Sequence, residues 1–228
     1  VVERAVFLGA LLEKYKYPIA VAGTHGKTTT SSMLSLVLLA AHKDPTILIG
    51  GELSQIGGNY HIGGNEYLPF EACEYVESFL HFKPFVSIIT NIEEDHLDYF
   101  KDLNHIITSF VKFASLTSDN GCNIVCIDEN TTQSIVQNVK KKAVTYALNN
   151  KNADYTAENI TLEKNGCPTF DIFNKDRKVL SVSLNVAGDH NICNALGVTA
   201  ACEFLGIEPE YIKSGLEEFR GAKRRFDR

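Results

Sequence analysis

The stretch GTHGKTTT occupies residues 23–30, directly after a short apolar segment at 18–22 and at the start of a helical pattern that runs from 27 to about 41. Its glycines let the backbone turn tightly and approach an anion, and the N-terminus of the following helix lies beneath the turn. A strand, a glycine turn and a helix in this order predict a loop that binds phosphate.

The side chains of this loop suit a nucleotide with magnesium. Lys27 can neutralise the β- and γ-phosphates, and the Thr28 hydroxyl can bind Mg²⁺, which prefers oxygen ligands. The standard pattern has a further glycine where Ala20 stands, so the loop is a shortened GxxGK[ST] form. The alternative, a glycine turn that only joins a strand to a helix, does not require a Lys-Thr pair. The residues expected to contact the nucleotide are Gly23, Thr24, His25, Gly26, Lys27, Thr28 and Thr29.

The order of the remaining elements indicates an α/β fold. Strands rich in apolar and β-branched residues are expected at 46–49, 67–72, 85–90 and 123–127. Helical periodicity covers 3–16, 103–118, 190–205 and 209–219. This alternation predicts a mostly parallel sheet with helices on both faces. Short alternating segments with turn residues at 154–184 predict a small antiparallel sheet in addition.

Composition narrows the class of protein. The 228 residues carry a formal net charge of −6 without a basic block, which argues against nucleic acid as a partner. No apolar run reaches the roughly 18 residues of a membrane span, and the start lacks the pattern of a signal peptide, so we expect a cytoplasmic location and no membrane partner. The six cysteines include no CxxC pair and are expected to be reduced thiols.

Four motifs follow one another in a familiar order: GTHGKTTT at 23–30, EACEYVESF at 71–79, TNIEEDHLDYF at 90–100 and GDHNICNALG at 188–197, with FRGAKRRF at 219–226 as a weaker fifth. In these motifs the chain resembles the Mur ligases, which use ATP and Mg²⁺ to form amide bonds in peptidoglycan precursor synthesis. The resemblance implies a P-loop NTPase-like central domain. Residues 1–228 would be the ATP-binding domain of a three-domain ligase, between a UDP-sugar domain and an amino-acid domain, and the isolated fragment would be inactive.

The histidine at position 25 points, within this resemblance, to the branch that joins L-alanine to UDP-N-acetylmuramate through an acyl phosphate. Two alternatives stay open. A ligase of the same fold would add a peptide to the sugar nucleotide, or glutamate to folate. A nucleotide-dependent switch would change shape on binding, but the chain has no NKxD signature for guanine. The sequence does not predict the oligomeric state.

The second and third motifs supply carboxylates and a histidine at the ends of predicted strands, where ligands bind in open α/β sheets. By resemblance, Glu71 would bind the magnesium ion held by Thr28; a solvated surface glutamate is the alternative. His96 would contact a second Mg²⁺, with Asn91 positioning its loop; a capping or core role is the alternative. Lys27, Glu71 and His96 are therefore the expected catalytic residues, and Thr28, Glu71 and His96 the expected metal ligands.

Less specific signals come from the rest of these motifs. Glu74 and Ser78 could face the sugar substrate, whereas Glu77 could equally be plain surface. Lys112 lies downstream of His96, where several family members carry a carbamylated lysine, but the sequence assigns it no role.

The last two motifs supply amides and a positive charge. Asn191 and Asn194 lie about one helical turn apart and would, by resemblance, flank the adenine; helix capping by Asp189 and Asn191 is the alternative. Alignment of the last motif places Arg225 near the nucleotide, although it could also belong to a simple charged end.

Overall fold

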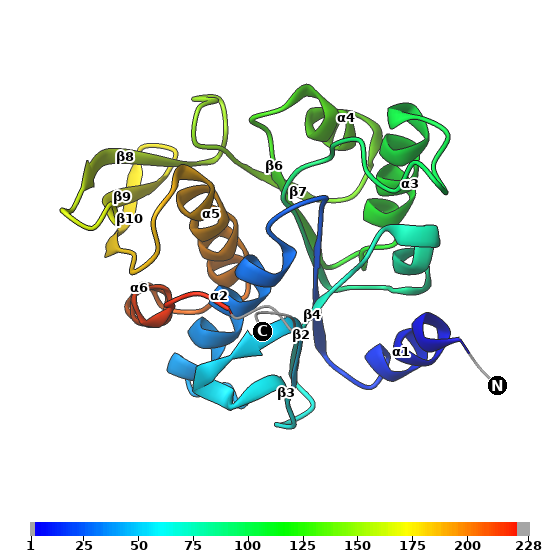
Figure 1. The fold of residues 1–228 in the computed structure, drawn as a ribbon, viewed down its shortest axis with the longest axis horizontal. Coiled ribbons are helices and arrows are strands. Elements are labelled where there is room, and N and C mark those ends of the chain that lie inside the picture. Colours follow the sequence, from blue (N-terminus) through cyan, green and yellow to red (C-terminus); the bar gives the residue numbers. More distant parts are fainter. Residues whose placement is uncertain (1–2, 223–228) are drawn as a thin grey trace.

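The computed structural model describes residues 3–222, which fold around one ten-stranded sheet (Figure 1). The strand order is β10-β9-β8-β7-β6-β5-β1-β4-β2-β3. The strands are β1 (Tyr17–Ala22), β2 (Ile47–Leu53), β3 (Gly58–His61), β4 (Tyr67–Glu71), β5 (Val86–Ile89), β6 (Cys122–Cys126), β7 (Ala143–Tyr146), β8 (Tyr155–Leu162), β9 (Pro168–Asn174) and β10 (Arg177–Ser183). The helices are α1 (Arg4–Leu12), α2 (Lys27–Ala40), α3 (Leu103–Ser115), α4 (Asn130–Asn138), α5 (Asp189–Phe204) and α6 (Pro209–Glu218), with 3₁₀ helices η1 (Ser54–Ile56) and η2 (Tyr75–His81).

The expected α/β fold is confirmed. Strands β2, β4, β1, β5, β6, β7 and β8 pair in parallel, and β3, β9 and β10 add antiparallel ladders at the two edges. The antiparallel strands at 154–184 join the main sheet through the pair Tyr146↔Tyr155 instead of forming a separate sheet. Strands β3 and β7 and helix α4 were not predicted from the sequence. β3 and β7 have four residues each, and α4 contains few strong helix formers.

Alternate residues of β1 face two different cores. Helices α2, α5 and α6 cover one face of the sheet, and α1, α3 and α4 cover the other (Figure 1). Ile19 and Val21 belong to the core under the first group, whereas Ala20 and Ala22 belong to the core under the second, which also includes residues of η2. All four are completely buried. A strand buried on both faces reads as a continuous apolar run, as β1 does. Among the described residues, none of the helices has the length and apolar character needed to cross a bilayer.

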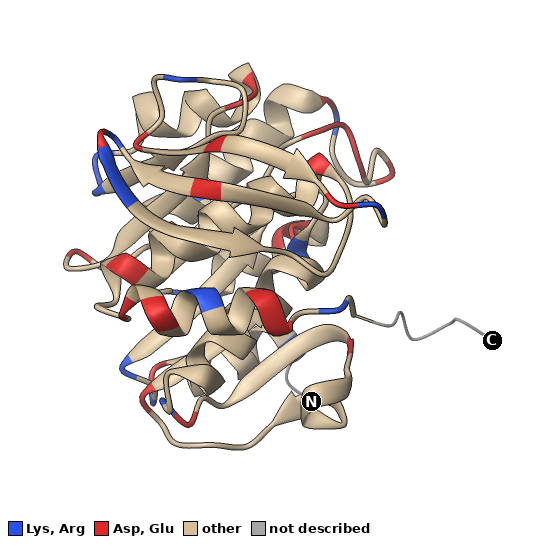
Figure 2. Cartoon of the chain, turned by 90° about the vertical axis from the view of Figure 1, so that its left-hand side faces the viewer, with Lys and Arg blue, Asp and Glu red and all other residues tan. Residues whose placement is uncertain are grey.

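Acidic and basic residues are interspersed along β8–β10 and α6 (Figure 2). Lys178 on β10 pairs with Asp171 on β9 at 2.8 Å. Hydrogen bonds from Lys178, Ser181 and Asn159 lower the pKa of Asp171 to about 2. These contacts join β8, β9 and β10 at the edge of the sheet.

Helix α6 supports α2 by direct backbone contact at Gly215. A Cβ atom at this position would overlap the Val37 backbone and lie 2.7 Å from the Leu36 carbonyl carbon. Because α2 begins at the phosphate loop, this contact fixes the helix that carries the loop.

We predict that Gly215→Ala destabilises the protein. Alanine favours a helix by about 1 kcal/mol over glycine, but a Cβ pressed against backbone cannot rotate away, and overpacking typically costs about 1–3 kcal/mol. Urea unfolding should therefore show a lower midpoint. Gly58→Ala is the matched control, because a Cβ there meets nothing within 4 Å. An unchanged midpoint for Gly215→Ala would contradict the described packing.

Candidate functional site

The phosphate loop joins the carboxyl end of β1 to the first turn of α2, and its shape depends on two glycines. Gly23 has φ 141° and Gly26 has φ 83°, a region that favours glycine. A side chain on Gly23 would overlap the Thr90 hydroxyl after β5. Thr28 and Thr29 lie half-buried in the first turn of α2.

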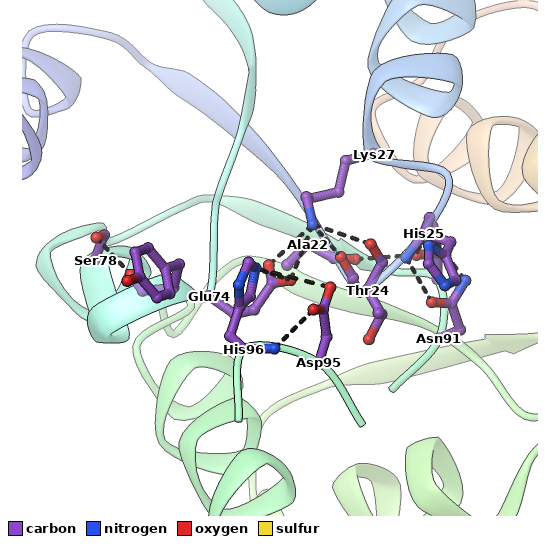
Figure 3. A network of polar contacts seen from close by, with 12 residues as sticks. Ala22, Thr24, His25, Lys27, Glu74, Ser78, Asn91, Asp95 and His96 are labelled. Atoms are coloured by element: carbon purple, nitrogen blue, oxygen red, sulfur yellow. Dashed lines mark hydrogen bonds and ion pairs between the residues drawn. The ribbon is translucent and has the colours of Figure 1, made fainter. Parts of the chain in front are cut away.

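The loop after β5 holds the phosphate loop in place (Figure 3). The His25 N–H donates to the Asn91 side-chain oxygen at 2.8 Å, and the Asn91 amide donates back to the His25 carbonyl at 3.1 Å. The Thr90 hydroxyl donates to the same carbonyl at 2.7 Å. The Thr24 N–H donates to the Asn91 carbonyl at 3.1 Å. Asn91 therefore positions the phosphate loop itself, whereas the His25 side chain is exposed.

Lys27 lies at the centre of the site. Its Nζ donates to the Gly23 carbonyl at 2.5 Å and to the Thr24 carbonyl at 3.3 Å. It also donates to both carboxylate oxygens of Glu74, at 3.1 and 3.0 Å. The side chains of Lys27 and Glu74 are 17% and 3% exposed, so each charge depends on the other for compensation.

Glu74 also belongs to a group of three possible metal ligands. One ligand atom each from Glu74, Asp95 and His96 lies within 4.8 Å of the others. His96 Nε2 is 4.0 Å from Glu74 Oε1 and 3.8 Å from Asp95 Oδ2 (Figure 3). His96 has φ 53°, a backbone conformation that costs free energy for a residue with a side chain. Its ring packs on the Tyr75 ring, with the two ring centroids 4.6 Å apart. Carboxylate oxygens with an imidazole form a donor set that can hold a hard divalent cation.

Glu71 has different partners. It accepts hydrogen bonds from the Gly50 N–H at 2.5 Å and from the Ser31 hydroxyl at 3.3 Å, and the same hydroxyl donates to the Thr28 carbonyl at 3.1 Å. Glu71 thus lies beside the first turn of α2, at the rim of a cavity of about 300 Å³ that is also lined by Ser78, Cys73 and residues of α1 and β2. Among the described residues, no hydrogen bond or ion pair joins Glu71 to Lys27. Glu71, which the sequence predicted as a metal ligand, lies outside the group formed by Glu74, Asp95 and His96.

Glu77, for which the sequence predicted no specific role, anchors the segment after Glu74. Glu77 has φ 55° and accepts hydrogen bonds from the hydroxyls of Ser109 on α3, at 2.5 Å, and of Tyr99, at 3.2 Å. Lys112 lies 3.6 Å away. The hydrogen bond from Ser109 is the main reason why the pKa of Glu77 is lowered. Its positioning role could not be read from the sequence, because the partners come from elements far away in the chain.

Helix α5 reaches the phosphate loop with its first turns. Asn194 is 7% exposed, and a Cβ on Gly26 would lie 3.0 Å from its side-chain oxygen. The Asn191 amide donates to the Ala187 carbonyl at 2.7 Å. The N-cap of α5 is Gly188, without a side-chain cap, so capping by Asp189 or Asn191 is not observed. Arg225 lies outside the described residues.

The family model described as the Mur ligase middle domain matches residues 21–202. The chain belongs to the Mur ligase family. This membership confirms the resemblance carried by the four motifs.

Individual relatives agree with the family. The chain is 49% identical over 225 residues to a UDP-N-acetylmuramate–L-alanine ligase of Acetivibrio thermocellus, covering 99% of this chain and 48% of that protein. It is 47% identical over 227 residues to the Clostridium tetani protein of the same name, covering 100% of this chain and 49% of that protein. The chain thus spans about half the length of the curated relatives it matches.

Solved Mur ligase structures show the same fold. The UDP-N-acetylmuramate-alanine ligase of Thermotoga maritima superposes with a TM-score of 0.83 at 32% identity, covering 96% of this chain and 49% of that one. A ligase from Neisseria meningitidis whose name includes L-alanyl-γ-D-glutamyl-meso-diaminopimelate superposes with a TM-score of 0.81 at 27% identity. The match covers 96% of this chain and 71% of that one.

The Glu77 network leads to a pH-dependent prediction. Glu77→Gln should lower the free energy of unfolding by about 1 kcal/mol near neutral pH, because charge-assisted hydrogen bonds become neutral ones. A lowered pKa means that the carboxylate stabilises the fold above its unfolded value, near 4.5, and that this contribution is lost as the pH falls through the folded value. Unfolding of wild type and variant should therefore differ at neutral pH and converge once the pH lies below the lowered pKa of Glu77. Glu94→Gln, in the same region but exposed, is the control; a Glu77→Gln difference that is absent or independent of pH would contradict the network.

Proposed function

We propose that this chain is the central, ATP-binding domain of a ligase that joins L-alanine to the lactyl carboxylate of UDP-N-acetylmuramate in peptidoglycan precursor synthesis. A UDP-sugar domain before residue 1 and an amino-acid domain after residue 228 would complete the enzyme. The observation that carries the proposal is the convergence of Lys27, Glu74 and His96 beside a phosphate loop. The names of the relatives at 43–49% identity support the choice of sugar nucleotide and amino acid.

The reaction we propose has two steps. An oxygen of the lactyl carboxylate attacks the γ-phosphorus of ATP, the bond to the β–γ bridging oxygen breaks, and ADP leaves. The amine of L-alanine then attacks the acyl carbon, phosphate leaves with the electrons of the broken C–O bond, and the amine gives up a proton to form the amide. Neither step requires a side chain of this protein as nucleophile, so the contribution of the domain is positioning and charge stabilisation.

Lys27 is the group we assign to the transferred phosphate. In the described structure its ammonium donates to two loop carbonyls and to Glu74. Phosphate oxygens entering the loop would compete for these donors and draw Lys27 towards the β- and γ-phosphates. The N–H groups at the start of α2 and the positive end of that helix would add to the attraction.

The site also fits magnesium, because its donors are mainly oxygens and their charge is negative. Two carboxylates border the loop, and we favour Glu74 over Glu71 as a ligand, since only Glu74 lies with Asp95 and His96. Thr28 at the start of α2 would contribute its hydroxyl; Glu71 remains the second candidate. Mg²⁺ bound there would offset charge on the phosphate oxygens and bring the two anionic substrates together.

Asn191 and Asn194 are the residues we propose for the adenine. Asn194 lies against Gly26, so a nucleotide whose phosphates occupy the loop would extend along the first turns of α5. We also propose that Arg225 contacts the nucleotide, on the evidence of the sequence motif alone.

The test is product formation by the whole protein with ATP, Mg²⁺, UDP-N-acetylmuramate and one amino acid at a time. We expect phosphate release and a mass gain of the sugar nucleotide that corresponds to L-alanine. Lys27→Ala should reduce turnover by about 10³-fold or more, because it removes the main charge at the transferred phosphate. Lys43→Ala, at a partly buried lysine just after α2, is the control.

Other outcomes would change the assignment. A mass gain with a tripeptide but with no amino acid would move the protein to the branch of the Neisseria relative. ATP hydrolysis that does not depend on any sugar nucleotide would favour a nucleotide-dependent switch. Full turnover by Lys27→Ala would remove the loop from the reaction.

A further inference from the structure

Two thiols lie in contact at the edge of the proposed nucleotide site, in positions that the proposed reaction does not use. Cys126 is the last residue of β6, and Cys193 lies in α5 between Asn191 and Asn194. Their sulfur atoms are 3.5 Å apart. Cys126 is 4% exposed, and Cys193 is partly exposed.

We propose that Cys126 and Cys193 form an oxidant-sensitive thiol pair that closes to a disulfide and thereby weakens nucleotide binding. The second half of this proposal rests on the proposed function; formation of the disulfide does not. A disulfide requires sulfurs about 2.05 Å apart, so the two side chains need to approach by roughly 1.5 Å.

The surroundings shift the pKa values of the two thiols in opposite directions. Either thiol can donate the hydrogen bond between the two sulfurs. With Cys193 as the donor, this bond is the main reason why the pKa of Cys126 is lowered, and a hydrogen bond with the Asp128 backbone adds to it. The same contact, with burial, raises the pKa of Cys193. We therefore assign the first attack to Cys126 and the attack that resolves the oxidised intermediate to Cys193.

Two other buried thiols, Cys122 and Cys202, differ from this pair. Burial raises the pKa of Cys122 to about 11, and it also raises the pKa of Cys202. Within the described part of the chain, neither has a thiol partner, and the sulfur of Cys122 donates only to a backbone carbonyl. Cys122 and Cys202 should therefore be less reactive than the pair at β6 and α5.

The reaction with a hydroperoxide balances without a cofactor. The Cys126 thiolate attacks one peroxide oxygen, the O–O bond breaks, and a sulfenic acid and hydroxide form. The Cys193 sulfur then attacks the Cys126 sulfur, the S–O bond breaks, and the Cys193 proton leaves with the released hydroxide as water. Two thiols are oxidised to a disulfide, and one hydrogen peroxide is reduced to two waters.

A cation site at the same place is less well supported. Asp128 is the nearby third possible ligand. Both of its oxygens already accept backbone N–H bonds at 2.8–2.9 Å, from Leu148, Asn149 and Asn150. The carboxylate thus organises the loop after β7, and two sulfurs alone do not make a zinc site.

The position of Cys193 connects the thiol pair to the nucleotide. Asn194 follows it directly and lies against Gly26 of the phosphate loop. Drawing Cys193 towards β6 shifts the first turns of α5 and with them both asparagines. We expect ATP affinity to fall by about tenfold, the order expected when one buried hydrogen-bonding group is displaced.

The first test is chemical. The protein is treated with hydrogen peroxide, the free thiols are blocked, and peptides are mapped without reduction. We expect a peptide that joins Cys126 to Cys193, a loss of two hydrogens from the intact mass, and reversal by dithiothreitol. Cys193→Ala should abolish the crosslink, and Cys202→Ala, on the same helix, should retain it. Higher oxides on Cys126 without a crosslink, or a retained zinc ion that blocks oxidation, would overturn the proposal.

The second test measures ATP binding by calorimetry in the reduced, oxidised and re-reduced protein. We expect affinity to fall on oxidation and to recover on reduction, and the Cys193→Ala protein to be insensitive to peroxide. A mapped disulfide with unchanged affinity would overturn the link to the nucleotide. Absence of ATP binding by the reduced wild-type protein would instead contradict the proposed function and leave the mapped disulfide standing.

Discussion

The buried ion pair between Lys27 and Glu74 is the interaction on which the site depends. Two charges that are 17% and 3% exposed lose most of their hydration, and their mutual contact and the loop carbonyls compensate for that loss. Removing one partner leaves the other charged and unpaired. The pair also connects the first turn of α2 to the segment after β4, so it holds together two of the three loops that form the site.

The parallel sheet explains why these loops meet. Strands β4, β1 and β5 are hydrogen-bonded neighbours, and their carboxyl ends lie at the same edge of the sheet. The motif after each strand therefore arrives at the same place. Asn91 then fixes the phosphate loop through both of its amide atoms. The left-handed backbone at His96 and Glu77 turns side chains into this edge, at a cost that the hydrogen bonds of Glu77 and the packing of Tyr75 offset.

Much of this could be predicted from the sequence, because the decisive signals are local. The strand, glycine turn and Lys-Thr pair at 18–28 indicated the phosphate loop, and the alternation of apolar segments indicated the α/β fold. The sequence could not show in which direction each side chain points. Glu74 follows Glu71 by three positions, and only the backbone turn after β4 decides that Glu74 meets Lys27 while Glu71 meets Gly50. The contact between Cys126 and Cys193 likewise joins residues 67 positions apart, with no shared motif.

The most direct measurement of the central claim is ATP binding to the whole protein, with and without Mg²⁺, for wild type, Glu74→Gln and Glu71→Gln. If Glu74 holds the cation beside Lys27, Mg²⁺ should strengthen ATP binding to wild type and to Glu71→Gln, and should have little effect on Glu74→Gln. Binding of ATP without Mg²⁺ should be unchanged or tighter in Glu74→Gln, because Lys27 no longer has a carboxylate partner. A Glu74→Gln protein that keeps the full Mg²⁺ effect, together with a Glu71→Gln protein that loses it, would contradict the account.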